Sequence, residues 1–439
     1  MKALTKFSLG FLSLAAVALG FTSCSSEDVT SGTNQGKMSS LTLTINTGKS
    51  MGSRATDWTT ADPAGAKKED TENKINRVAI GIFSHSGAVK TIVELTPSKT
   101  STTGTNSLSL TDASHAKATI VTSSLVADAD NKDEVLVAIN APTGTFTGCQ
   151  DKDAFMKKTE TAAEALANYD QTSLPNPTKQ VNTNIPMFGS ASLKGSGSSF
   201  TADVTVIHMI AKVSLAELKV DFKAGSAYAD AEFTPKAVFL INVPNSFQFD
   251  NTPDDNGDYK NAWLSAGYEH GWGTFTDHAY TASVNSSAAS TFSGSTFKEY
   301  LTTSALEDKI LRGADEESNA NASYGKQVYF YTMPNGQDDD KATKLVIAGH
   351  FKSTKAGIDK DVYYPLFLNA TVNNTGTGYN PAVTGSDAKK VYPNKNYNCK
   401  VVIRNIGAGS PNTNLDPQTA SISITVTDFV TAEQKTEFN

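Results

Sequence analysis

Cysteine and positive charge are both scarce in this sequence, and each shortage excludes a class of function. Only 3 of the 439 residues are cysteine, and none stands in a CxxC or similar metal-binding or redox spacing. For Cys149 and Cys399 we expect two separate thiols, with a disulfide in an oxidising compartment as the alternative. The formal net charge is -7. Nucleic acids attract broadly basic surfaces, so we expect no nucleic-acid partner.

Motifs of catalysis and metal binding are missing as well. The 6 histidines stand in no HExxH or other zinc spacing, and neither a GxSxG nucleophile elbow nor a GxxxxGKS/T phosphate loop occurs. The acidic stretch 254–258 departs from the EF-hand pattern, because Thr252 holds the first ligand position and no glutamate closes the loop. We expect no enzyme, no cofactor and no metal site, with a catalytic group assembled only in space as the remaining alternative.

Long apolar runs are confined to the N-terminus. Residues 7–20 are mostly apolar, follow Lys2 and Lys6, and are too short to span a bilayer comfortably. Small residues then lead to Cys24 in a pattern that resembles a bacterial lipobox. Residues 1–23 are therefore predicted to be a lipoprotein signal peptide and Cys24 to carry the lipid, palmitate included, with ordinary signal peptidase cleavage as the alternative. The acidic pair Glu27-Asp28 resembles the tethers of some surface-exported Gram-negative lipoproteins.

Short stretches that alternate apolar with small polar residues are abundant. Such alternation is typical of half-buried strands, and clusters of Asn, Asp, Gly and Pro separate the stretches. Their number predicts an all-β protein with two β-sandwiches. The predicted strands are 40–46, 77–83, 134–139, 204–215, 237–243, 328–332, 343–347, 362–368, 397–403 and 421–426.

Helical periodicity is limited to two places. Residues 152–169, with Asp151 or Asp153 as the N-cap, and residues 297–311 each carry an apolar stripe at helical spacing. We therefore expect one or two short helices that cover an end of a sandwich. The boundary between the two domains is placed near 208–212, within the long run of strand character.

The first and the last predicted strands share one pattern. Each has three aliphatic residues at every second position: Leu41, Leu43 and Ile45 in the first, Ile422, Ile424 and Val426 in the last. One strand could therefore replace the other, and replacement by a strand from another chain is a known form of association. Repeated head to tail, such a contact does not close and generates a filament.

The segment after the first strand favours proteolysis. Arg54 stands among small residues with little apolar content nearby, and local opening and nicking concentrate in such segments. A protease that cuts after Arg54 would release the first strand together with the lipid anchor and make Ala55 the new N-terminus. The alternative is a linker arginine without a processing role.

Aromatic residues gather in the strand-poor stretch 263–280. Trp263 and Trp272 are candidates for a ligand loop, because aromatic rings can stack on sugars or contact a protein partner. The alternative is that this loop packs on its own domain.

Several longer motifs add to the features described so far. Besides the lipobox at Cys24, they are SMGSRA at 50–55, ENKINRVAIGIF at 72–83, VLVAINAP at 135–142, IPMFGS at 185–190, IHMIAKVSL at 207–215, AVFLINVPNS at 237–246, YFYTMPN at 329–335, YPNKNYNCKVVIRNIG at 392–407 and SISITVTDFVTAEQ at 421–434. Together these motifs resemble the fimbrillin family, the type V pilins of Gram-negative anaerobes, and among them the shaft subunits of short fimbriae. The resemblance covers almost the whole chain.

The resemblance implies two transthyretin-like β-sandwich domains, lipoprotein export, arginine-specific cleavage after the first strand, and polymerisation by donation of a C-terminal strand. It implies that residues 24–54 form a propeptide containing a plug strand, that 55–209 and 210–439 form the two domains, and that 421–430 form the donor strand. Many relatives have tryptophan where this chain has Asp428 and Phe429, so the depth at which the donor's end is anchored stays open.

The expected function is that of a structural pilin subunit of surface fimbriae, used in adhesion, biofilm formation and virulence. Its partners would be further copies of itself in a head-to-tail filament, anchor and tip fimbrial subunits, an arginine-specific protease, and a host or bacterial surface receptor. The precursor would be a lipoprotein on the outer membrane surface and the mature form part of extracellular fimbriae. The alternative is a fimbrial tip or accessory adhesin that binds glycan or host protein through Trp263 and Trp272. A surface enzyme or glycan-uptake lipoprotein is a third class.

Overall fold

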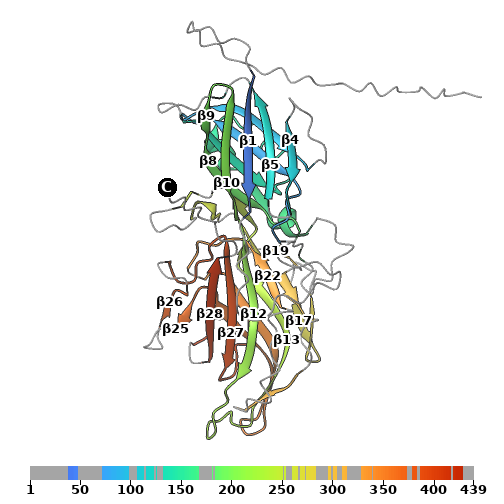
Figure 1. Ribbon diagram of the computed structural model, residues 1–439. Coiled ribbons are helices and arrows are strands. Elements are labelled where there is room, and N and C mark those ends of the chain that lie inside the picture. The colour runs from blue at the N-terminus through green and yellow to red at the C-terminus, as the bar shows by residue number, and fades with distance from the viewer. Residues whose placement is uncertain are drawn as a thin grey trace, which may run out of the picture. The chain divides into compact units, whose positions relative to one another are not determined.

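The structure is a computed structural model in which β-strands predominate (Figure 1). It describes residues 38–47, 72–97, 106–112, 115–122, 125, 132–167, 180, 183–250, 252–253, 260–264, 267–271, 273–282, 295–297, 300–303, 309–313, 328–338, 340–372, 378–382, 386–416 and 419–428. Among these residues, no helix has both the length and the apolar character needed to cross a membrane.

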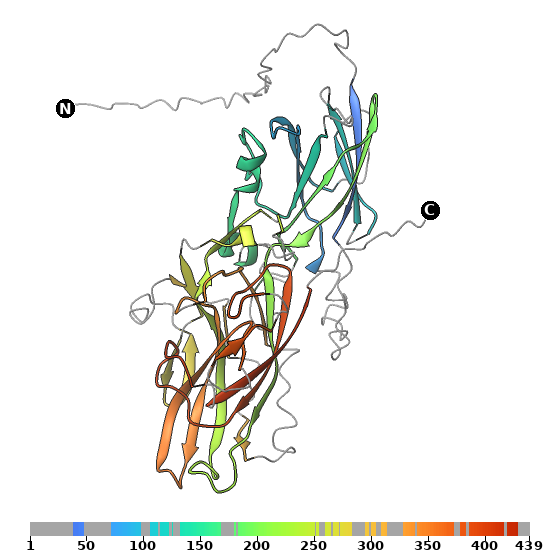
Figure 2. The ribbon, with the colours of Figure 1, turned by 90° about the vertical axis from the view of Figure 1, so that its left-hand side faces the viewer.

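An N-terminal sandwich is formed by two sheets that face each other across an apolar core (Figure 2). The first, called here the β1 sheet, has the order β4-β5-β1-β10-β9, and the second, the β2 sheet, has the order β11-β8-β6-β2-β3. The strands of the β1 sheet are β1 (Ser39–Asn46), β4 (Ser107–Leu110), β5 (His115–Thr122), β9 (Lys194–Ser196) and β10 (Ser199–Thr205). Those of the β2 sheet are β2 (Val78–Phe83), β3 (Val89–Leu95), β6 (Glu134–Ile139), β8 (Met187–Ser192) and β11 (Ile207–His208).

The β2 sheet is covered on both faces, which explains why its central strands are apolar throughout. All six residues of β2 are buried, and so are five of the six in β6. Ile80 and Val137 point to the core shared with the β1 sheet, whereas Phe83 and Leu136 belong to a second cluster that continues into the C-terminal half. A strand buried on both faces has no reason to alternate, so its sequence reads as a continuous apolar run.

A C-terminal sandwich follows the same plan. The β12 sheet has the order β22-β12-β27-β28, and the β13 sheet has the order β20-β13-β23-β24 with β21 also paired to β13. The strands are β12 (Ala211–Val220), β13 (Glu232–Ile241), β20 (Leu301–Thr302), β21 (Leu311–Arg312), β22 (Tyr329–Thr332), β23 (Lys344–Ser353), β24 (Ile358–Phe367), β27 (Lys395–Ile403) and β28 (Ala420–Asp428). The all-β sandwich architecture expected from the sequence is thereby confirmed.

Short additional strands pair at the margins of these sheets. They form the pairs β7 with β15 and β17 with β18, the pair β25 with β26, and a small sheet β14-β16-β19. Their bounds are β7 (Thr159–Thr161), β14 (Val243–Pro244), β15 (Ser246–Gln248), β16 (Tyr268–His270), β17 (Gly273–Thr276), β18 (Ala279–Ala282), β19 (Ser295–Thr296), β25 (Thr371–Val372) and β26 (Tyr379–Asn380). A short 3-10 helix, η2, spans Lys260–Ala262.

The helix predicted over 152–169 is much shorter in the structure. Helix α2 spans only Lys152–Met156, with Asp151 as the N-cap whose side chain accepts a hydrogen bond from the Ala154 amide. Strand β7 follows, and then a π-helix, η1, over Ala163–Ala167. Because β7 pairs with β15, hydrogen bonds to a distant strand replace the helical ones, and tertiary pairing overrides the local apolar stripe.

Two further predictions were wrong in detail. In its described part, the stripe over 297–311 forms a 3-10 turn at Tyr300, whose amide donates to the Phe297 carbonyl at 3.0 Å, and then the strands β20 and β21, which pair with β13. The continuous strand predicted over 204–215 is interrupted, because β10, β11 and β12 are separate elements. Over 204–215 the chain passes from the β1 sheet through the β2 sheet to the β12 sheet, whereas over 297–311 the two strands β20 and β21 pair with the same strand, β13.

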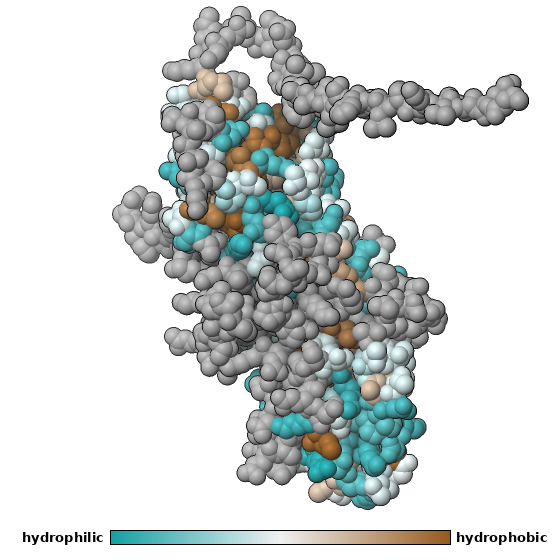
Figure 3. Space-filling model, turned by 90° about the vertical axis from the view of Figure 1, so that its right-hand side faces the viewer, coloured by the Kyte–Doolittle hydropathy of each residue, from teal (hydrophilic) through white to brown (hydrophobic). Residues whose placement is uncertain are grey.

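The surface of the described residues mixes hydrophilic and hydrophobic side chains. On the face drawn in Figure 3, hydrophobic residues form small separate patches among hydrophilic ones. The exposed large apolar side chains among the described residues are Met38, Leu110 and Ile310.

Candidate functional site: strand β1 and the strand positions around it

Strand β1 occupies the centre of its sheet although it lies at the start of the described chain. It runs antiparallel to β5 and parallel to β10, and both neighbours pair with it along almost its whole length (Figure 1). At its ends, the Ser40 amide donates to the Ser198 carbonyl at 2.9 Å and the Val206 amide donates to the Asn46 carbonyl at 3.0 Å. The backbone of β1 is therefore hydrogen-bonded on both sides from end to end.

One face of β1 is entirely buried. Leu41, Leu43 and Ile45 have no exposed surface and belong to the core that the two N-terminal sheets share. On the opposite face Thr44 is exposed. The period-two alternation of the sequence is thus the pattern of a strand with one face in the core.

The middle of the three aliphatic side chains has small neighbours. Leu43 pairs with Ala118 of β5 on one side and with Ala202 of β10 on the other. Short side chains on both flanking strands leave room for the large side chain of Leu43 between them. Without β1, a gap one strand wide would separate β5 from β10. The apolar residues of the β2 sheet would form the bottom of this groove.

Three residues with predicted roles lie outside the described residues: Cys24, predicted to carry the lipid, and Arg54 and Ala55, predicted to flank the cleavage site. Beyond Thr47, the next described residue is Glu72.

Glu72 is fixed by a buried polar network that links it to the C-terminal sandwich. Its carboxylate Oε1 accepts a hydrogen bond from Lys212 Nζ at 2.6 Å and another from the Tyr331 hydroxyl. Its backbone carbonyl accepts from His208 Nε2 at 3.1 Å. Glu72 and Lys212 are 5% and 6% exposed, so this ion pair is shielded from solvent and breaking it would leave a buried charge.

Burial sets the protonation of the groups around Glu72. Burial lowers the pKa of His208 to about 4, against a weaker opposing effect of its hydrogen bond to the Glu72 carbonyl. Burial, with the negative charge of Glu72, raises the pKa of Tyr331 well above its usual value. Both groups are therefore neutral at neutral pH, and the charges in the network are those of Glu72 and Lys212. This network was not predicted from the sequence. The feature that could have indicated it is Lys212, a charged residue within the apolar run 207–215.

Strand β28, which contains the predicted donor residues, lies at the margin of the β12 sheet as described. It pairs antiparallel with β27 over its full length, with Ile422 opposite Val401, Ile424 opposite Cys399 and Val426 opposite Tyr397. The side chain of Ile424 is 8% exposed and belongs to the core of this sandwich. Phe429 lies outside the described residues. In this structure β28 completes the fold of its own chain, with one neighbouring strand where β1 has two.

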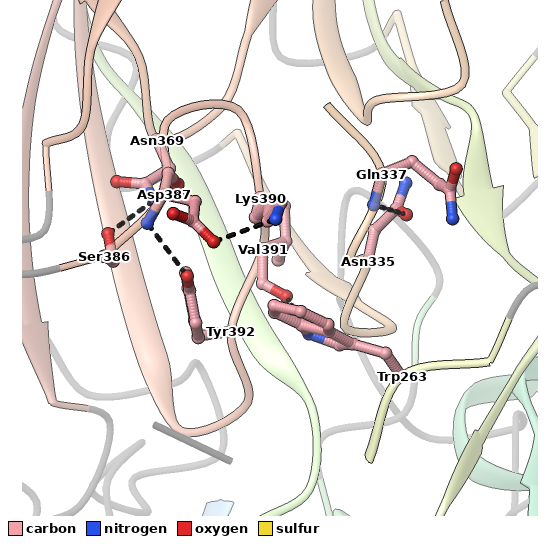
Figure 4. Close-up of polar contacts among 9 residues, drawn as sticks. All are labelled: Trp263, Asn335, Gln337, Asn369, Ser386, Asp387, Lys390, Val391 and Tyr392. Atoms are coloured by element: carbon pink, nitrogen blue, oxygen red, sulfur yellow. Dashed lines mark hydrogen bonds and ion pairs between the residues drawn. The ribbon is translucent and has the colours of Figure 1, made fainter. Parts of the chain in front are cut away.

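Trp263 packs on its own chain rather than projecting from it. Its ring N–H donates to the Val391 carbonyl at 3.0 Å, and its ring lies 5.2 Å from that of Tyr392 (Figure 4). A Cβ atom at Gly336 would stand 2.3 Å from the Trp263 ring, so the backbone there lies directly against it. These contacts are the ones expected if the segment around Trp263 packs on its own domain.

The neighbouring aromatic residues follow the same arrangement. Tyr268 and Tyr280 are nearly buried, and Phe275 packs with Tyr280 against Tyr363 of the β13 sheet. Trp272 lies outside the described residues.

The two remaining cysteines are free and buried, which confirms the expectation of two separate thiols. Burial raises the pKa of both thiols, so neither is a reactive thiolate at neutral pH.

Comparison with solved structures finds the same fold in proteins described as fimbrial or adhesion proteins. A candidate cell adhesion protein from Bacteroides eggerthii matches with a TM-score of 0.53 and 17% identity, over 91% of this chain and 98% of the other. Another from Parabacteroides distasonis matches with a TM-score of 0.52 and 14% identity, over 90% and 98%.

A fimbrilin from Porphyromonas gingivalis matches equally well, with a TM-score of 0.53 and 15% identity, over 90% of this chain and 99% of the other. The chain therefore has the fold of a fimbrilin, in agreement with the likeness to fimbrillins seen in its sequence. No family model matches the chain, and no curated protein matches it.

Proposed function

We propose that this chain is a structural subunit of surface fimbriae that polymerises by strand exchange after removal of β1. The observation that carries the proposal is the position of β1, a central strand with three fully buried aliphatic side chains, encoded ahead of a segment that contains Arg54. Cleavage after Arg54 would convert this covalently attached strand into a separate peptide. The fold shared with a fimbrilin supports the same function.

Cleavage by itself would not empty the strand position. Burial of the three aliphatic side chains stabilises the bound strand by roughly 5 to 9 kcal/mol. Each hydrogen bond to β5 or β10 adds a net contribution of about 1 kcal/mol. The cut strand would therefore remain bound until another strand displaces it. This keeps the apolar floor of the groove covered during export, when an exposed edge would promote aggregation.

The C-terminal strand is suited to replace β1. Its aliphatic residues at 422, 424 and 426 repeat the spacing of 41, 43 and 45. In its own sheet β28 has one ladder, with β27, whereas the position of β1 offers two. To enter a neighbouring subunit, β28 must leave its own sandwich and lose its hydrogen bonds to β27. It would then form hydrogen bonds to two strands, β5 and β10 of the neighbour, which favours assembly.

The network around Glu72 supports retention of the new N-terminus. After cleavage, the chain from Ala55 onward would remain tied to the fold at Glu72 through Lys212 and Tyr331. Only the segment up to Arg54, with the lipid at Cys24, would be lost.

The remaining elements of the proposal concern location and partners. The precursor would be anchored by lipid on the outer membrane surface and the mature chain would be part of an extracellular filament, which contributes to adhesion and biofilm formation. Other copies, anchor and tip subunits, an arginine-specific protease and a surface receptor are its proposed partners. The alternative of a tip adhesin is not favoured by Trp263, whose ring is engaged by its own chain.

The test compares processing and assembly in three chains: wild type, Arg54→Ala, and a truncation that ends before Ala420. Digestion with an arginine-specific protease should give an N-terminus at Ala55 and filaments in electron micrographs for the wild type. Arg54→Ala should stay intact and monomeric. The truncated chain should be cut but should not polymerise. Filaments from Arg54→Ala would refute the processing step, and filaments from the truncated chain would refute the donor strand.

A further inference from the structure

Two histidines and an aspartate converge on the outside of the C-terminal sandwich. His278 Nδ1 lies 3.0 Å from Asp361 Oδ1, and His350 Nδ1 lies 3.1 Å from the same oxygen. The two imidazole rings are 4.0 Å apart between centroids. In the part of the chain that the structure describes, this is the one group of three such side chains whose ligand atoms all lie within 4.8 Å of one another.

The fold brings these residues together from three elements. His350 of β23 and Asp361 of β24 are direct partners in the register of the hairpin, so their side chains share one face of the sheet. His278 comes from the turn between β17 and β18, where Asp277 and His278 have φ of 48° and 63°. That left-handed turn is tight, and it delivers the imidazole of His278 to the face of the hairpin.

A second carboxylate orients the inner histidine. His350 Nε2 lies 2.9 Å from Asp359 Oδ1, and Asp359 is itself held by Lys352 Nζ at 3.1 Å. A metal-binding histidine usually donates its other ring N–H to a carboxylate, which fixes the ring and its tautomer. Asp359 is placed to accept that bond from His350.

We propose that His278, His350 and Asp361 form a binding site for a borderline divalent cation, with Zn²⁺ as the best match. Two imidazole nitrogens and one carboxylate oxygen are ligands that zinc prefers, at about 2.0 to 2.2 Å from the metal. Ligand atoms around a tetrahedral zinc are therefore about 3.3 Å apart, and the separations of 3.0 and 3.1 Å need little adjustment. The side chain of His278 is 54% exposed, so water can take the fourth position.

The site would attach the β17–β18 hairpin to the β23–β24 hairpin. Phe275 and Tyr280 already pack against Tyr363 beside it, and the cation would add a bond at the turn. The competing interpretation is a cluster of hydrogen bonds in which both histidines share Asp361 and no metal takes part. The two interpretations predict different responses to added zinc.

The experiment is calorimetric titration of the purified, metal-free chain with zinc chloride, with magnesium chloride as a comparison. The site predicts saturable binding of one Zn²⁺ per chain and no comparable binding of Mg²⁺, which requires oxygen ligands. His278→Asn is the preferred variant, because asparagine tolerates the left-handed turn conformation. It should weaken zinc binding at least about tenfold, and Asp359→Asn should weaken it roughly 10- to 100-fold.

His115→Ala is the matched control, since His115 forms an exposed pair with Asp112 that lacks a second histidine. This variant should bind zinc as the wild type does. Melting temperatures in EDTA test whether each variant still folds, and zinc should raise the melting temperature of the wild type but not of His278→Asn. Absence of saturable binding, or equal binding by the wild type and His278→Asn, would overturn the proposal. Equal losses in His115→Ala and His278→Asn would overturn it too, because the zinc would then bind surface histidines indiscriminately.

Discussion

Truncation of Leu43 to alanine isolates the contribution of β1 to the precursor. Leu43 is fully buried between Ala118 and Ala202, and neither neighbour has a side chain that can fill the vacated space. Leucine-to-alanine changes in cores cost about 2 to 5 kcal/mol, and more when the surroundings cannot collapse. We therefore expect a loss of about 4 kcal/mol in the free energy of unfolding.

Thr44→Ala is the matched control for this substitution. It changes the next residue of the same strand, but on the exposed face, and should alter the free energy of unfolding by less than about 0.5 kcal/mol. Urea denaturation of both uncleaved variants, followed by circular dichroism, measures the difference. Equal midpoints for the two variants would refute the role of Leu43 as the central anchor of β1.

The same pair of variants tests release of the strand after cleavage at Arg54. If the lost energy belongs to the bound strand, the cut fragment should dissociate roughly a hundredfold faster or more in Leu43→Ala, since each 1.4 kcal/mol is about a factor of ten. Filament growth from cleaved Leu43→Ala should be correspondingly faster than from Thr44→Ala. Unchanged growth would mean that strand release does not limit assembly.

Three further predictions concern other parts of the fold. Glu72→Gln should destabilise the chain by about 3 to 5 kcal/mol in urea titrations, because it leaves Lys212 buried without its counter-charge; a change within error would show that the pair is solvated. The pKa of His208 is lowered to about 4 in the folded chain, so the unfolded chain binds a proton more readily and stability should fall as the pH drops from about 6.5 to 4. His208→Gln should flatten that part of a pH series of unfolding midpoints, and an identical pH dependence would contradict the assignment. Trp263→Ala should lower the unfolding free energy by about 2 kcal/mol, less than the roughly 3 to 5 kcal/mol of a fully buried tryptophan because Trp263 is half-buried, without changing the binding of monomers on a glycan array; lost glycan binding would support the adhesin alternative.

The sequence predicts the strands well because burial leaves a direct mark on residue order. Alternation reveals β1, which has one buried face, and the continuous apolar run reveals β2, which has two. Helix prediction failed over 152–169 because the pairing of β7 with β15 depends on a strand far along the chain. Local periodicity contains no information about such a partner.

The candidate site was only partly accessible to sequence reasoning. The spacing of Leu41, Leu43 and Ile45 indicated which side chains are buried, but not that β1 is central in its sheet or that β28 already pairs within its own sandwich. The cluster at His350 was missed because its members come from three elements. Predicting the turn between β23 and β24 would have given the register of this hairpin, and the register pairs His350 with Asp361. The proximity of the two residues could therefore be predicted from strand pairing, but not from a sequence motif.

The direction of β1 has a consequence for the filament proposed above. Because β1 is parallel to β10 and antiparallel to β5, a donated strand running the same way would reproduce both observed ladders. If every donated strand enters in that direction, the contacts repeat head to tail and the proposed filament would be polar, with a vacant acceptor at one end and an unused donor at the other. A subunit that kept its own β1 could donate a strand but not accept one. Such an uncut subunit would terminate the chain at that end, so the extent of cleavage would set filament length.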